Sequence, residues 1–61
     1  MERLLTITEV SEITRTPIAT LRFWRHGRVT GPKSGRLGRR VVYRESDVAA
    51  WITEQFDGGV D

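Results

Sequence analysis

Nine positively charged side chains occupy the middle of this 61-residue chain, and no acidic residue interrupts them. They are nine of the ten basic residues of the protein, namely Arg15, Arg22, Arg25, Arg28, Lys33, Arg36, Arg39, Arg40 and Arg44. All eight acidic residues lie outside this segment, so the formal net charge of +2 conceals a basic centre between acidic flanks. Crowding like charges has an electrostatic cost that a polyanionic partner offsets. The arrangement therefore favours nucleic-acid binding over the simpler alternative, a solvated basic face.

The basic residues are almost all arginine, with Lys33 as the one lysine. A guanidinium group donates two parallel hydrogen bonds to a phosphate or to a base edge, which a lysine ammonium does not. The same bias is also compatible with a GC-rich genome. The sequence does not separate these two causes.

Other groups that carry chemistry are few. There is no cysteine, and His26 is the single histidine, so neither a disulfide framework nor a histidine-cysteine metal site is available. No glycine-rich phosphate loop and no carboxylate pair occur in the middle of the chain. We therefore expect no enzymatic activity, no cofactor, no metal and no small-molecule ligand. His26 is expected at the surface, near a helix end.

The length predicts one small domain over residues 1–57, followed by a disordered tail at 58–61. A chain of this size buries only about 60% of its unfolded surface, which leaves one modest core. No apolar run approaches the roughly 18 residues of a membrane span, and the N-terminus lacks a signal-peptide pattern. We therefore expect a cytoplasmic protein with no membrane partner.

Two helices are predicted in the first half of the chain. Residues 6–9 fit a capping box with Thr6 as the cap, although Thr8 is an alternative cap. One side of the helix that follows is apolar, with Ile7, Val10 and Ile13. Thr16 and Pro17 then predict a cap and first turn for a second helix at about 17–26, which stops at Gly27. A helix, a three-residue turn and a helix give the spacing of a helix-turn-helix.

The second half predicts a polar connector at 28–35, a β-hairpin at 36–43 and a third helix. A three-residue hairpin loop at 38–40 is preferred, because it points Leu37, Val41 and Tyr43 inward together. The third helix begins at 45–47 with acidic residues in its first turn and ends at Gly58 and Gly59. Its apolar stripe consists of Val48, Trp51, Ile52 and Phe56.

This order of elements predicts a small winged helix-turn-helix of the α+β class, mostly helical, with three helices and a two-stranded β-hairpin wing. The second helix of such a domain fits the major groove of DNA, and the wing reaches a neighbouring stretch of backbone or minor groove. Trp24 and Trp51 lie on apolar stripes, so we expect them in the core. Arg3 and Arg44 flank the domain and are interpreted as solvated residues.

Twelve residues are predicted to bind DNA. Thr16 and Thr20 are expected at phosphates or base edges, and Arg22 and Arg25 are expected to read bases or phosphates. Phe23 either stacks on a sugar or packs under the wing. Backbone contacts are assigned to Arg15, Arg28, Lys33 and Arg36, the wing tip to Arg39 and Arg40, and His26 to the same surface.

Several short stretches, in this order, resemble the excisionase-type, MerR-like helix-turn-helix domains. They are Leu4–Val10, Thr20–Trp24 with Gly27, Leu37–Gly38 with Arg40, Tyr43–Arg44 and Ser46–Trp51. The resemblance covers about Leu4–Ile52, nearly the whole chain. Two features depart from it: Thr14-Arg15-Thr16 replaces a glycine-containing turn, and the wing loop is long and polar.

The resemblance implies a phage excisionase, also called a recombination directionality factor, which binds double-stranded DNA at attachment sites, bends it and biases a phage integrase toward excision. The chain ends where the DNA-binding domain is expected to end, which favours an architectural factor over a regulator with a dimerisation helix. The acidic flanks and basic centre suggest that copies on adjacent DNA sites associate. A small MerR-like transcriptional regulator and a basic protein-interaction module are the alternatives.

Overall fold

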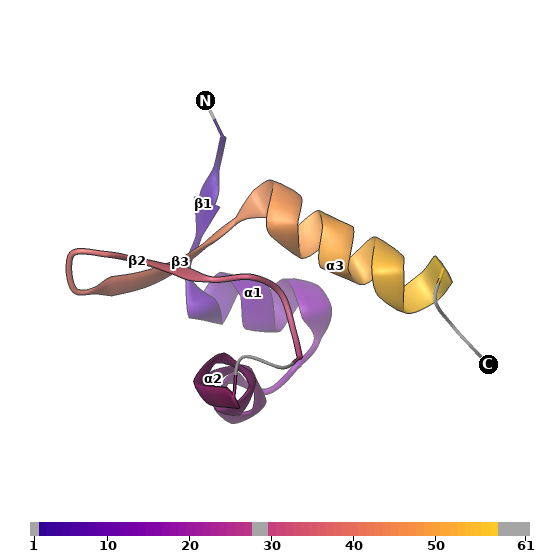
Figure 1. Ribbon diagram of the computed structural model, residues 1–61, viewed down its shortest axis with the longest axis horizontal. Helices are drawn as coiled ribbons and strands as arrows, with labels where there is room; N and C mark the ends of the chain where they lie inside the picture. Colours follow the sequence, from indigo (N-terminus) through magenta and orange to yellow (C-terminus); the bar gives the residue numbers. More distant parts are fainter. Residues whose placement is uncertain (1, 28–29, 58–61) are drawn as a thin grey trace.

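The computed structural model describes residues 2–27 and 30–57 of the chain. Along the chain the elements are β1 (Leu4–Leu5), α1 (Ile7–Thr14), α2 (Ile18–Gly27), β2 (Gly35–Leu37), β3 (Arg40–Arg44) and α3 (Glu45–Asp57). Three helices and a small antiparallel sheet confirm the predicted winged helix-turn-helix of the α+β class. Figure 1 shows the β2–β3 hairpin projecting from one side of the molecule and α3 extending from the other. The predicted tail at 58–61 and the predicted helix end at Gly58 and Gly59 lie outside the described residues.

The sheet has three strands, not only the two of the predicted hairpin. β1 pairs with β3 in antiparallel fashion, Leu4 opposite Arg44 and Leu5 opposite Tyr43, so the strand order is β1-β3-β2. A strand of two residues is too short to show the alternation of apolar and polar residues that predicts a strand. The sequence therefore did not indicate that these residues pair with β3. It ties the start of α1 to the base of the hairpin.

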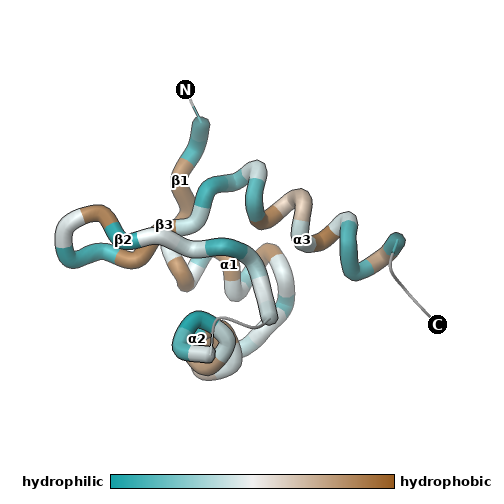
Figure 2. The backbone as a smooth tube through the Cα atoms, viewed as in Figure 1, coloured by the Kyte–Doolittle hydropathy of each residue, from teal (hydrophilic) through white to brown (hydrophobic). Residues whose placement is uncertain are grey.

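The hairpin register differs from the predicted one. β2 and β3 pair Gly35 with Val42, Arg36 with Val41 and Leu37 with Arg40, which leaves a two-residue loop of Gly38 and Arg39. The prediction of a three-residue loop was wrong because it assumed that Leu37 reaches the core, whereas Leu37 is 59% exposed. Gly38 has a φ of 62°, as expected for the glycine at the first central position of a type II′ turn. Figure 2 shows that the hairpin carries hydrophobic as well as hydrophilic positions out beyond the body of the molecule.

α1 begins with the predicted capping box, and Thr6 rather than Thr8 is the cap. The Thr6 hydroxyl accepts a hydrogen bond from the Glu9 backbone N–H at 3.1 Å, and the Glu9 carboxylate accepts one from the Thr6 N–H at 2.8 Å. This second hydrogen bond, together with the nearby Arg3 charge, lowers the pKa of Glu9 below its ordinary value of 4.5. The first helix therefore starts where local chemistry dictates.

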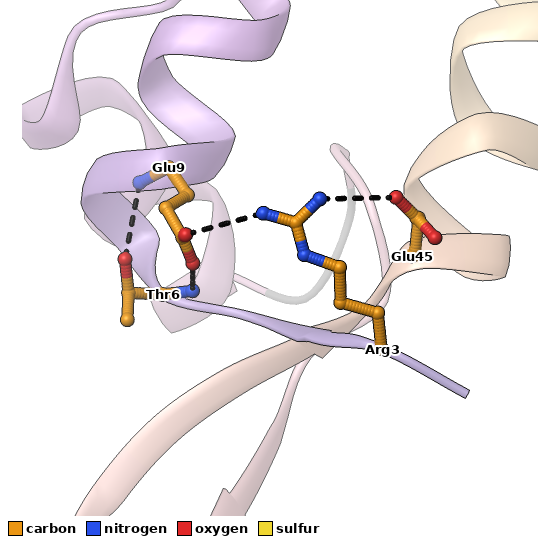
Figure 3. A network of polar contacts seen from close by, with 4 residues as sticks. All are labelled: Arg3, Thr6, Glu9 and Glu45. Carbon is orange, nitrogen blue, oxygen red and sulfur yellow. Dashed lines mark hydrogen bonds and ion pairs between the residues drawn. The ribbon is translucent and has the colours of Figure 1, made fainter. Parts of the chain in front are cut away.

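Ion pairs join the N-terminal strand to two helices. Arg3 lies 3.5 Å from a Glu9 carboxylate oxygen and 3.6 Å from a Glu45 oxygen (Figure 3), and Arg44 lies 3.0 Å from Asp47. The interpretation of Arg3 and Arg44 as merely solvated is thus corrected, because both have carboxylate partners. Exposed pairs of this kind contribute only about 0–1 kcal/mol each. They also distinguish these two arginines from the described cations that have no carboxylate partner among the described residues.

The start of α3 is held by the N-terminal segment. The Arg3 carbonyl accepts a hydrogen bond from the Glu45 N–H at 3.0 Å, and the Glu2 carboxylate accepts one from the Ser46 N–H at 2.8 Å. Hydrogen bonds from Ser46 lower the pKa of Glu2. These contacts satisfy N–H groups of the first helical turn, which have no partner within the helix. Residues 44 positions apart in sequence are thereby joined.

The core consists of five buried side chains, each from a different element: Leu5, Val10, Leu21, Tyr43 and Val48. Partly buried apolar residues surround them, namely Ile7, Trp24, Val41 and Ile52. The predicted apolar stripes are thus confirmed at their centres. They are wrong at their ends, because Ile13 is 50% exposed and Phe56 is 82% exposed. The last turns of α1 and α3 thus carry apolar side chains that lie outside the core.

Trp24 packs against this core and joins α2 to both α3 and the connector. Its ring centroid lies 5.7 Å from that of Trp51, with the planes tilted by 51°. The backbone of Gly31 approaches so closely that a Cβ atom there would lie 2.6 Å from Trp24 Cε3. Gly31 also has a φ of +89°, which favours glycine. Trp24 is therefore a packing residue, as predicted, and it fixes the path of the connector.

The three glycines that the structure describes outside the helices offer a graded test of this packing. We expect Gly31→Ala to lower the free energy of unfolding by about 3 kcal/mol, because it adds overpacking to a strained φ. Gly38→Ala, which has a φ of +62° but open space around it, should cost about 1 kcal/mol. Gly35→Ala is the matched control, since it has neither feature, and should stay within about 0.5 kcal/mol of wild type. Urea unfolding followed by tryptophan fluorescence measures the order, and equal values for Gly31→Ala and Gly38→Ala would contradict the proposed contact.

Candidate nucleic-acid interface

The turn between α1 and α2 is held by Ser11. Its carbonyl accepts a hydrogen bond from the Thr16 N–H at 3.1 Å, and its hydroxyl donates to the Thr16 carbonyl at 2.6 Å. Between these two residues Arg15 adopts a left-handed conformation, with φ 56° and ψ 36°. This is the position at which glycine most often ends a helix. An arginine there carries a conformational cost of about 1–2 kcal/mol.

The predicted cap of α2 is not where the sequence placed it. The carbonyl that accepts the first helical hydrogen bond belongs to Pro17, which receives the Leu21 N–H at 3.1 Å. The Thr16 hydroxyl instead donates to the Thr14 carbonyl at 3.2 Å. The helix therefore begins at Ile18, and Thr16 belongs to the turn. The prediction failed because Ser11 competes for the Thr16 backbone, a contact between positions five apart.

The outer side of α2 is an exposed stripe, which we call the α2 face. It is made of Ala19, Arg22, Phe23 and His26, spaced i, i+3, i+4 and i+7, which places them on one side of a helix. Phe23 is 75% exposed, so of its two predicted positions the structure excludes packing under the wing. Leu21 faces the other way into the core, and Thr20 is half-buried. An exposed aromatic ring between a guanidinium and an imidazole forms a surface suited to base edges and sugars.

Arg25 does not share this face. Its side chain is half-buried, and its Nε donates a hydrogen bond to the Ser34 hydroxyl at 3.0 Å. The contact joins the last turns of α2 to the connector before β2. The charge of Arg25 also acts on Tyr43, whose hydroxyl is buried without a hydrogen-bond partner among the described residues. Burial raises the pKa of Tyr43, and Arg25 opposes that rise.

The remaining basic residues follow the connector and hairpin. Lys33 and Arg36 are exposed at the base of the hairpin, and Arg39 and Arg40 are exposed at its tip. The two-residue loop places Arg39 within the turn itself and Arg40 opposite Leu37. The predicted arginine-tipped wing is therefore present, with one of its two arginines in the strand.

The structure thus sorts the twelve predicted residues into groups. Arg15 and Thr16 form the turn, Arg22, Phe23 and His26 lie on the α2 face, and Arg39 and Arg40 lie at the tip. Arg25, Lys33 and Arg36 line one hollow beside residues 30–35. Thr20 is half-buried, and Arg28 lies outside the described residues. Sequence reasoning missed Ala19, for which the helical spacing from Arg22 was the available signal. Ser34 was not predicted either, because nothing in the sequence except its place in a polar connector indicates its contact with Arg25.

Charge pairing distinguishes two sets of cations. Within residues 2–27 and 30–57, the ion pairs involve only Arg3 and Arg44 as cations. The other seven described cations, at positions 15, 22, 25, 33, 36, 39 and 40, have no carboxylate partner in that part of the chain. Figure 1 shows the N-terminus and β1 on the side of the molecule away from α2. The unpaired cations form a surface that attracts a polyanion.

Two further findings concern the described ranges alone. No group of three His, Asp or Glu side chains there is arranged to hold a metal ion. No helix among the described residues combines the length and apolarity needed to cross a membrane.

A helix-turn-helix with an exposed second helix and a basic hairpin defines the class of DNA-binding domains. The chain belongs to the helix-turn-helix domain family, whose family model matches residues 4–55. This family includes excisionase-like DNA-binding proteins. Comparisons with curated proteins and with solved structures gave no match.

Substitutions of Arg15, which has a left-handed backbone conformation, test its effects on stability and on DNA binding separately. We expect Arg15→Gly to raise the free energy of unfolding by about 0.5–1 kcal/mol, because glycine relieves the strain but adds unfolded-chain entropy. Arg15→Ala keeps the strain and should give no such gain. Both variants lose the same charge, so both should weaken DNA binding by the same factor. Urea unfolding and fluorescence anisotropy with labelled duplex measure the two effects, and equal stabilities of the two variants would contradict the conformational cost.

Proposed function

We propose that this protein is an excisionase, a sequence-specific architectural protein that binds double-stranded DNA at phage attachment sites, bends it and directs a phage integrase toward excision. The observation that carries the DNA-binding part is the set of seven cations that lack carboxylate partners within the described ranges. Two things support the more specific role: membership of a family that includes excisionase-like proteins, and the sequence resemblance over Leu4–Ile52.

The α2 face is proposed to enter the major groove, which at about 12 Å wide admits a helix. Arg22 then reads base edges, and Phe23 packs on a sugar or on a thymine methyl group. Ala19, which has only a methyl side chain, permits close approach at the start of the helix. Arg15 and Thr16, in the turn that precedes α2, are proposed to contact the phosphate backbone beside the groove.

The hairpin supplies a second contact away from α2. Arg39 and Arg40 are proposed to reach the backbone or minor groove next to the site of α2. The molecule extends 39 Å along its longest axis, and the hairpin projects from its body (Figure 1). A duplex that curves toward the protein meets both α2 and the hairpin, and the added phosphate contacts offset the energy of bending.

Several copies are proposed to act together. A single module of this size buries about 600–1,000 Å² of protein surface on DNA, which is the low end of the specific range. Acidic residues of α3, among them Glu54 and Asp57, are exposed on a part of the chain distant from the basic hairpin. Contacts between the acidic part of one copy and the basic part of the next would favour binding at adjacent sites. This role requires neither catalysis nor a cofactor.

Two arginines in different places distinguish reading from backbone contact. We expect Arg22→Ala to weaken binding to the attachment site by about 1–3 kcal/mol while changing binding to unrelated duplex much less. Arg39→Ala should weaken both duplexes by the same factor and reduce the salt slope by about 0.9, the value for one phosphate. Arg3→Ala is the matched control, because it removes the same charge from a paired position. Anisotropy titrations at several salt concentrations measure these effects.

The outcomes of these titrations have distinct meanings. Identical behaviour of Arg22→Ala and Arg39→Ala would contradict the assignment of the α2 face as the reader. Binding to heparin as tight as binding to duplex would instead favour a basic module without DNA preference.

An excision assay tests the role itself. DNA with two phage attachment sites is incubated with the phage integrase that acts on them, and the excised circle is quantified by PCR. We expect the circle to form only when this protein is present, and Arg22→Ala to abolish most of it because site binding is lost. Excision that is independent of the protein, together with altered transcription from a neighbouring promoter, would favour the small MerR-like regulator.

A further inference from the structure

A hollow lies between the recognition helix and the wing, apart from both the α2 face and the hairpin tip. Residues 30–36 curve around it, and Trp24 and Arg25 of α2 close its other side, with a volume of about 740 Å³. We call this space the connector hollow. It lies where the chain passes from α2 to β2.

The charged residues that line the connector hollow are all positive. Arg25, Lys33 and Arg36 line it together with Thr30 and Ser34, and no carboxylate among the described residues lines it. None of the three cations has an ion pair with a described residue. Three like charges around one concave space repel one another unless an anion lies between them. Hydroxyl and guanidinium groups together suit phosphate oxygens.

Arg25 is oriented for such an anion. Its Nε is occupied by the hydrogen bond to the Ser34 hydroxyl at 3.0 Å. A guanidinium has five N–H donors, so the four on its terminal nitrogens remain for a ligand. Because the side chain is half-buried, its field is screened less than that of an exposed arginine. The fixed fork matches two oxygens of one phosphate.

Contacts within the protein hold the walls of the hollow. Gly31 contacts the Trp24 ring so closely that no side chain fits between them, and Pro32 is buried. Trp24 is in turn held against Trp51 on α3. A preformed site loses little conformational freedom when its ligand binds. Residues 30–35 therefore form one wall of the hollow in addition to linking α2 to β2.

We propose that the connector hollow binds one phosphate group of the DNA backbone, at the point where a strand passes from the groove of α2 toward the wing. Arg25 holds two oxygens of that phosphate, and Lys33 and Arg36 add charge from the connector side. Arg25 is thereby a backbone anchor and not a base reader. The proposal rests on the proposed DNA-binding function and specifies one site within it.

The test is a cycle that combines protein variants with neutral phosphates. Duplexes that each carry a single methylphosphonate, one per position along the attachment site, are titrated with wild type and with Arg25→Gln. We expect Arg25→Gln to bind unmodified DNA about tenfold more weakly, as for loss of a charge-assisted pair. At one position the methylphosphonate should weaken wild type by a similar factor and leave Arg25→Gln unaffected. Arg39→Gln is the matched control and should respond fully at that same position.

Two further arms keep the result specific to the hollow. Ser34→Ala leaves every charge in place but releases Arg25, so it should lose affinity and show a smaller coupling at the same position. Circular dichroism melts confirm that each variant is folded before titration. Inorganic phosphate, compared with chloride at equal ionic strength, should not displace the duplex, because one free anion lacks the neighbouring contacts. Displacement by inorganic phosphate at low millimolar concentration would overturn the assignment to the DNA backbone.

The failures of the two proposals are distinguishable. If wild type binds the duplex with a steep salt slope but no position couples to Arg25, the phosphate site is overturned and DNA binding stands. If wild type shows no preference for duplex DNA over heparin, the proposed function fails and the site within it fails too.

Discussion

The mutual contact of five buried side chains is the constraint on which the rest of this structure depends. Leu5, Val10, Leu21, Tyr43 and Val48 come from β1, α1, α2, β3 and α3, one from each element. Full burial of each such side chain contributes about 1.5–3 kcal/mol, and each of these elements has only one fully buried side chain among the described residues. β2 alone contributes no buried residue, and the hairpin tip is therefore held only by its strand pairing. The element that is least anchored in the core is the one proposed to reach along DNA.

The charged residues that the structure describes divide into paired and unpaired sets. Carboxylates near the N-terminus and at the start of α3 take Arg3 and Arg44 as partners, and the other described cations remain without such partners. The domain thereby keeps a repulsive basic surface that a nucleic-acid backbone relieves. Arg15 adds a conformational cost to the electrostatic one, because it holds a left-handed position that suits glycine. Costs of this kind are commonly found at functional surfaces.

The basic segment is not one surface but several with different physical settings. The α2 face is exposed and includes an aromatic ring, which suits contact with bases. The connector hollow is concave and preformed, which suits a single phosphate, and the hairpin tip is a projecting pair of arginines. Trp24 links the first two, because it packs between α2, α3 and Gly31. A change in that packing would shift the α2 face and the connector hollow relative to each other.

Features that depend on neighbouring residues could be predicted from the sequence. The capping box at Thr6, the acidic start of α3, the centres of the apolar stripes and the concentration of cations all follow from short-range chemistry and period. The tertiary structure alone decided the pairing of β1 with β3, the hairpin register, the role of Thr16 and the division of the arginines. Each of these depends on a partner that local pattern does not reveal: Tyr43 for Leu5, Ser11 for Thr16 and Ser34 for Arg25. The prediction of the hairpin register was wrong for a related reason. Alternating apolar residues predict a buried face of a strand only where the strand lies against the core. At Leu37 the hairpin has already passed beyond that core.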